Sequence, residues 1–99
     1  MKIAIAGKSD SLDCEVSNVS GRAPYYLIFE DKKLVKSIKN PFMFGGGSGL
    51  SIVQLLYNES VQLIIAGNFG ENVLSSMDSK GIKHKIENDK TISQILEEI

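Results

Sequence analysis

Two glycine-rich segments and one arginine are the residues of this chain whose types and order suit the binding of an anion. Gly45-Gly46-Gly47-Ser48-Gly49 and Gly67-Asn68-Phe69-Gly70-Glu71-Asn72 each precede an apolar helical pattern. Free N–H groups and the positive dipole end at a helix start attract anions. Arg22 adds a planar set of donors. Turns and caps need the same glycines, and Arg22 could pair with Asp10 or Asp13, so both interpretations stay open.

Known nucleotide and catalytic motifs do not match these residues. The first glycine run lacks the lysine and the spacing of a Walker loop, and no G-x-G-x-x-G follows the apolar segment at residues 3–6. That segment carries no acid, and Glu59 follows a helix at its far end, so the acidic pair needed for two-metal chemistry is missing. No cysteine–histidine or serine–histidine–aspartate set is evident. We therefore expect a binding protein and not an enzyme.

Cys14 is the single cysteine of the chain. It excludes an internal disulfide and suits a reducing cytoplasm, where we expect the protein to reside. Its thiolate could serve as a soft metal ligand, or the thiol could be unreactive. Met43 is the other sulfur expected near the glycine runs, and His84 is expected to be packed or solvated.

The elements that must position these residues follow from hydrophobic periodicity. We expect strands over 2–7, 24–30, 34–39, 61–66 and 82–87, and helices over 50–58, 70–79 and 91–99. In the last strand, Ile82, His84 and Ile86 should share one half-buried face. Residues 8–20 show almost no apolar periodicity, which indicates a long and mobile loop.

This order predicts an α/β fold in a single domain over residues 1–99. A hairpin joins the second and third strands, and two right-handed crossovers make the later strands parallel. With the most apolar strands, the first and fourth, at the centre, the sheet order is 3-2-1-4-5 and the second strand alone is antiparallel. That is a ribonuclease-H-like arrangement. Gly7, Arg22 and both glycine runs then gather at one edge, beside a crevice between the first and fourth strands.

The composition of the chain argues against several classes of binding partner. The 99 residues are 42% hydrophobic, which favours one folded domain over disorder. A net charge of −1 with interspersed lysines and acids provides no basic surface for nucleic acid or an anionic membrane. No apolar run approaches the roughly 20 residues of a membrane span. Lys33, Lys36 and Lys39 along the third strand are typical of a protected sheet edge.

Four segments follow one another in a recognisable order: Met1-Lys2-Ile3-Ala4-Ile5, Gly21-Arg22-Ala23-Pro24-Tyr25-Tyr26, the run at 45–49, and Ala66-Gly67-Asn68-Phe69-Gly70-Glu71-Asn72. Together they resemble the dinitrogenase iron–molybdenum cofactor biosynthesis (NifX-like) family. The resemblance spans essentially the whole chain. It implies the ribonuclease-H-like sheet and a role as carrier of an iron–sulfur or iron–molybdenum-type cluster or its precursor. A cluster donor or acceptor protein would then be a partner.

The chain also departs from the family pattern. Members often carry a histidine and an aromatic residue directly before Gly-Arg, where this chain has Val19 and Ser20. Two functions therefore stay open: a metallocluster carrier with Cys14 as a metal ligand, and a metal-free binding module for an anion or phosphorylated metabolite. In both, we expect ligand contacts from Gly7, Arg22, Gly45, Gly46, Gly47, Ser48, Gly49, Asn68, Gly70 and Asn72.

Overall fold

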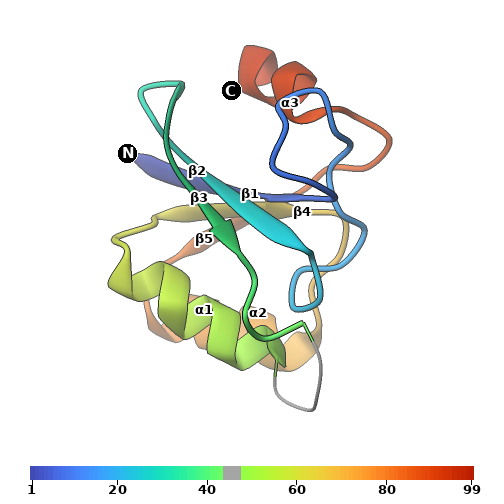
Figure 1. The fold of residues 1–99 in the computed structure, drawn as a ribbon. Coiled ribbons are helices and arrows are strands. Elements are labelled where there is room, and N and C mark those ends of the chain that lie inside the picture. Colours follow the sequence, from blue (N-terminus) through green and yellow to red (C-terminus); the bar gives the residue numbers. More distant parts are fainter. Residues whose placement is uncertain (44–47) are drawn as a thin grey trace.

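The computed structural model describes residues 1–43 and 48–99, which form a five-stranded sheet and three helices (Figure 1). The strands are β1 (Lys2–Gly7), β2 (Tyr25–Glu30), β3 (Lys33–Lys39), β4 (Leu63–Ala66) and β5 (Lys83–Ile86). The helices are α1 (Ser48–Asn58), α2 (Glu71–Ser79) and α3 (Ile92–Glu98). Every element lies where the periodicity predicts it. No helix in the described residues is long and apolar enough to cross a membrane.

The sheet order is β3-β2-β1-β4-β5, which confirms the predicted order. β2 pairs antiparallel with β1 and β3, whereas β1 pairs parallel with β4, and β4 with β5. Ala4 lies at the centre, between Ile28 and Ile64. β1 and β4 are the most apolar strands because helices cover both of their faces.

Helices α1 and α2 pack on one face of the sheet, and α3 packs on the other (Figure 1). Leu56 of α1 and Met77 of α2 belong to the first core cluster, together with Ile64. Ile92 and Ile95 of α3 belong to the second. The two faces of the sheet therefore carry two separate cores, and any site belongs to one side or the other.

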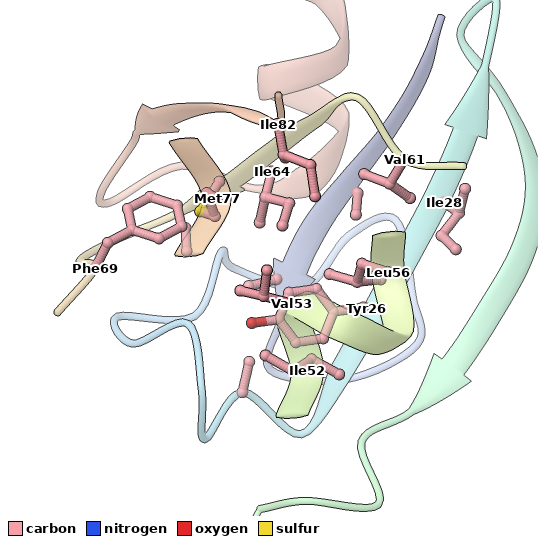
Figure 2. Packing of buried hydrophobic residues seen from close by; sticks show 14 residues of the cluster. Tyr26, Ile28, Ile52, Val53, Leu56, Val61, Ile64, Phe69, Met77 and Ile82 are labelled. Atoms are coloured by element: carbon pink, nitrogen blue, oxygen red, sulfur yellow. The ribbon is translucent and has the colours of Figure 1, made fainter. Parts of the chain in front are cut away.

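Tyr26 places a hydroxyl group inside the core beneath α1. Figure 2 shows this oxygen beside Val53. The oxygen is buried and has no hydrogen-bond partner within the described residues. Burial raises the pKa of Tyr26 far above its usual range, so the phenol stays neutral and packs as an aromatic ring.

The predicted half-buried face of β5 is wrong. Ile82 is buried, but His84 is exposed and the side chain of Ile86 is 54% exposed. β5 is an edge strand, and of these three residues only Ile82 belongs to the core cluster that contains Met77 of α2. The ring of His84 packs edge-on against Phe69, with centroids 5.5 Å apart.

Ion pairs join the end of β5 to α3. The carboxylate of Glu87 lies 3.0 Å from Lys90 and 3.2 Å from Lys85, and Lys90 lies 2.6 Å from Glu98. Hydrogen bonds from Lys90 and Lys85 hold the pKa of Glu87 below its ordinary value. The carboxylates of Glu98 and Glu87 raise the pKa of Lys90. These pairs fix the connection between the sheet and α3.

Ser17 joins the ends of the two central strands through its backbone. Its N–H donates to the carbonyl oxygen of Ala6 at 2.8 Å, and its own carbonyl oxygen accepts from Gly67 N–H at 2.8 Å. The neighbouring Val16 N–H donates to the carbonyl oxygen of Lys90 at 2.9 Å. The chain therefore occupies the place between β1 and β4 where the sequence predicts an open crevice.

The loop after β1 is also bound to the start of α3. The N–H of Ile92 donates to the carbonyl oxygen of Cys14 at 2.9 Å, and that of Ser93 donates to Leu12 at 3.0 Å. Thr91 caps α3, accepting from Gln94 N–H in a complete capping box. The predicted loop is present, but its ends are held by the sheet and by α3.

Hydrogen exchange tests how firmly this loop is held. We expect the amides of Val16 and Ser17 to exchange as slowly as those of β1, because both donate to carbonyl groups of ordered elements. The exposed amides of Asp10 and Leu12 should exchange fast. The measurement is amide exchange followed by NMR. Exchange of Ser17 as rapid as that of Asp10 would show that the crevice opens freely.

Gly67 tests how tightly the loop crosses β4. A Cβ atom on Gly67 would lie 2.4 Å from Oδ1 of Asn88 and 2.7 Å from Cα of Asn18. We expect Gly67→Ala to lower the free energy of unfolding by about 1–3 kcal/mol through overpacking. Gly70→Ala is the matched control, because it adds the same Cβ atom and a Cβ on Gly70 meets no atom within 4 Å. Equal stability of the two variants in denaturant titrations would contradict the close approach.

Candidate functional site

Three segments that are distant in sequence meet where α1 and α2 begin. A Cβ atom on Gly49 would lie 2.5 Å from Cγ2 of Val73 and 3.9 Å from Cα of Gly21. The end of the glycine run, the Gly-Arg segment and the first turn of α2 are therefore neighbours. We call the region formed by Gly21, Arg22, Gly49 and residues 68–73 the helix-start region.

The beginning of α2 is open to solvent. Asn68, Gly70 and Asn72 are exposed. Gly70 is the N-cap residue, and no described side chain makes a capping hydrogen bond there. Within residues 1–43 and 49–99, the first N–H groups of α2 therefore have no side-chain acceptor and can bind water or an anion. Glu71 in the first turn adds one negative charge that an anionic ligand must tolerate.

Arg22 directly follows Gly21, which approaches Gly49 at the start of α1, and it is exposed. The two alternative partners that the sequence suggests, Asp10 and Asp13, form no ion pair with it. Across residues 1–43 and 48–99, no carboxylate pairs with this guanidinium. Its donors can therefore meet a ligand without first breaking an ion pair in the described part of the chain.

Asn40 positions the backbone on both sides of Arg22. Its Nδ2 donates to the carbonyl oxygens of Gly21 and Ala23, each at 2.9 Å. Its Oδ1 accepts from Phe42 N–H at 2.8 Å, and the residue is only 4% exposed. The hydrophobic pattern of the sequence assigns no role to Asn40, which follows the strand predicted over 34–39. A buried amide that holds backbone groups 17 and 19 residues away leaves no pattern in the sequence.

Cys14 and Gly7 lie on the opposite face of the sheet. The thiol of Cys14 packs with the α3-side cluster and donates to the carbonyl oxygen of Ser9 at 3.4 Å. Gly7 is buried, and a Cβ there would lie 3.3 Å from the sulfur of Cys14. The sequence predicts both residues in one site with Arg22, whereas the structure places the Cys14 thiol in the α3-side cluster and the Cβ position of Gly7 beside it.

Metal-ligating side chains are sparse. Among residues 1–43 and 48–99, no group of three or more histidine, cysteine, aspartate or glutamate side chains could hold a metal ion. Cys14 therefore has no set of co-ligands within that range. Of the two residues before Gly21, Val19 is exposed and Ser20 is buried.

Part of the predicted site is outside the described residues. This applies to Gly45, Gly46, Gly47 and the side chain of Ser48. Among the predicted residues, the structure brings Gly49 close to Gly21 and to Val73 in the first turn of α2. Cys14 packs on the α3 side of the sheet, and the Cβ position of Gly7 lies beside its sulfur.

A double-mutant cycle tests whether the two helix starts adjoin. We expect Gly49→Ala to be destabilising relative to the same change in a Val73→Ala background, because the new Cβ meets Cγ2 of Val73. The coupling free energy should be about 0.5–3 kcal/mol, as for residues in contact. Chemical denaturation of the four proteins measures it. A coupling near zero would mean that Gly49 and Val73 do not touch in solution.

Comparison with solved structures places this fold among known proteins. The apo form of the orange protein from Desulfovibrio gigas superposes with a TM-score of 0.89 at 20% identity, over 97% of this chain and 83% of that chain. An NMR structure of a Thermotoga protein of the DUF35 family gives a TM-score of 0.83 at 26% identity, over 97% and 84%. At 20% identity, the likeness to the orange protein shows a shared fold.

Comparison with curated proteins found no match. A family model described as dinitrogenase iron-molybdenum cofactor matches residues 1–99. This match covers the glycine runs and the Gly-Arg segment in one continuous alignment. The chain therefore belongs to the dinitrogenase iron-molybdenum cofactor family.

Proposed function

We propose that this protein is a non-catalytic carrier that holds an iron–sulfur-type metallocluster or its precursor at the helix-start region. The observation that carries the proposal is the meeting of Gly49, Gly21 and Val73, which brings three separate segments to one edge. Membership of the family relates the chain to the iron–molybdenum cofactor.

The donors available there suit the outer atoms of a cluster better than its metal ions. A cluster that brings its own sulfides presents negatively charged acceptors. The first N–H groups of α2 and the guanidinium of Arg22 can donate hydrogen bonds to them. Asn68 and Asn72 add exposed amide groups on either side of Gly70. In this proposal the chain recognises the cargo by hydrogen bonds and charge, without coordinating it.

Reversible holding is what a carrier requires. An uncapped helix start and an exposed arginine form a shallow site from which a cluster can pass to a donor or acceptor protein. Asn40 fixes the peptide around Arg22, which lowers the entropic cost of presenting the guanidinium.

We further propose that the sheet belongs to the ribonuclease-H-like class, on its strand order and its single reversed strand. We place the protein in the reducing cytoplasm.

A second candidate is a metal-free binding module for an anion or phosphorylated metabolite. It is favoured by the finding that the described residues contain no cluster of three or more histidine, cysteine, aspartate or glutamate side chains that could hold a metal ion. The same N–H groups and Arg22 would contact a phosphate. The two candidates share a location and differ in whether iron is needed.

Anaerobic reconstitution with iron and sulfide tests the carrier proposal. We expect charge-transfer absorbance in the protein fraction, and about a tenfold weaker retention of the cluster in Arg22→Ala, because a charge-assisted hydrogen bond is lost. Lys33→Ala, an exposed lysine at the far end of the sheet, should bind as the unmodified chain does. Cys14→Ser should keep the absorbance, because its thiol lies on the other face.

Two results would contradict the proposal. If Cys14→Ser lost the absorbance while Arg22→Ala kept it in full, the cluster would bind on the α3 side of the sheet and not at the helix-start region. Inorganic phosphate that shifts the amides of Gly70 and Asn72 without iron, while no absorbance forms, would favour the metal-free module.

A further inference from the structure

We propose a second binding site, for a nucleoside phosphate, in a groove at the opposite edge of the sheet. The groove has a volume of about 640 Å³, within the roughly 300–1,000 Å³ typical of small-molecule sites. It combines an aromatic ring, two ammonium groups and several hydrogen-bonding groups. Its lining residues are Lys2, Glu30, Tyr57, Asn58, Ser60, Val61, Gln62 and Lys80.

The groove lies where β1 and β4 begin and where α1 and α2 end, and its floor is held by backbone hydrogen bonds. Gln62 N–H donates to the carbonyl oxygen of Lys2, and Lys83 N–H donates to that of Gln62, both at 2.9 Å. Val61 N–H donates to the carbonyl oxygen of Leu56 at 3.1 Å. Because these groups belong to the ends of strands and helices, the site is formed before any ligand arrives.

Tyr57 offers the face on which a base can stack. Its side chain is 48% exposed although it is large and aromatic. The ammonium group of Lys80 lies 6.0 Å from the ring centroid, at the outer limit of a cation–π contact. Lys80 is therefore loosely held and can turn toward a ligand while the ring remains available for stacking.

Lys2 and Lys80 supply the positive charge that a phosphate needs. The Nζ of Lys2 donates one long hydrogen bond, 3.4 Å, to the carbonyl oxygen of Glu59. Within residues 1–43 and 48–99, no carboxylate lies within ion-pair distance of Lys2 or Lys80. Both ammonium groups can therefore reach a phosphate without giving up an ion pair in the described chain.

The remaining groups of the groove favour a ligand that also donates hydrogen bonds. Glu30 is exposed, and the carbonyl ends of α1 and α2 carry partial negative charge. These acceptors would repel a bare anion but suit the hydroxyl groups of a ribose. An aromatic base, a phosphate and sugar hydroxyls occur together in a nucleotide, which selects this class over a simple anion.

This site is independent of the proposed carrier function, because it uses the other ends of the same helices. Titration with adenosine monophosphate at low salt, followed by NMR, tests it. We expect the largest amide shifts at Tyr57, Gln62 and Lys80. Adenosine alone and inorganic phosphate alone should each bind more weakly than the nucleotide, since each lacks one of the two contacts.

Variants separate stacking from charge. We expect Tyr57→Ala to weaken nucleotide binding about tenfold through lost stacking. Lys80→Ala should weaken it about fivefold, as for an exposed charge pair. Lys39→Ala, an exposed lysine outside the groove, is the matched control and should bind as the unmodified chain does. If Tyr57→Ala lowers stability, Tyr57→Leu removes the stacking surface and keeps apolar bulk.

Three results would overturn the proposal. The first is the absence of amide shifts at millimolar nucleotide. The second is equal affinity of the unmodified chain, Tyr57→Ala and Lys80→Ala. The third is a set of shifts centred on Gly49, Gly70 and Asn72, which would assign the nucleotide to the helix-start region.

Discussion

The two hydrogen bonds made by the backbone of Ser17 determine how this domain is built where its central parallel strands end. They connect Ala6 near the end of β1 to Gly67 just after β4. β1 and β4 are neighbouring parallel strands. In open α/β sheets, this is the position where ligands commonly bind. Here a segment of the same chain fills it, and Ser17 is only 5% exposed. A ligand must therefore be recognised beside this segment and not beneath it.

The glycines of this edge differ in what their missing side chains allow. At Gly67, atoms of Asn18 and Asn88 occupy the place that a Cβ would need, so the glycine permits the loop to cross β4. At Gly49, the space belongs to Val73, so the glycine permits α1 to approach α2. At Gly70, no atom would meet a Cβ, so the absent side chain leaves the start of α2 open. Of these three glycines, the last is the one whose surroundings leave room for a ligand.

The order of strands could be predicted because burial on both faces of a strand requires apolar residues at every position. Residues 3–6 and 63–66 meet this condition, and both became central strands. The Ser17 bridge could not be predicted, because backbone hydrogen bonds leave no mark on the side-chain pattern. The face of β5 was predicted wrongly, because the alternation of apolar and polar residues does not show which part of an edge strand another element covers. Ile82 is buried, but Ile86 is exposed. Asn40 was missed since its partners are backbone carbonyls in another segment.

The directions of α1 and α2 explain why the edge at the end of β4 and the edge at the beginning of β4 differ in chemistry. Both helices direct their free N–H groups toward the end of β4 and their free carbonyl groups toward its beginning. The first edge therefore attracts acceptors such as sulfides or phosphate oxygens, and needs only Arg22 to strengthen that preference. At the second edge, the helix carbonyl groups repel a bare anion. Lys2 and Lys80 lie there and offset this repulsion. Because the same helix dipoles act at both edges, the two proposed sites call for different ligands, and they lie at opposite ends of the same helices.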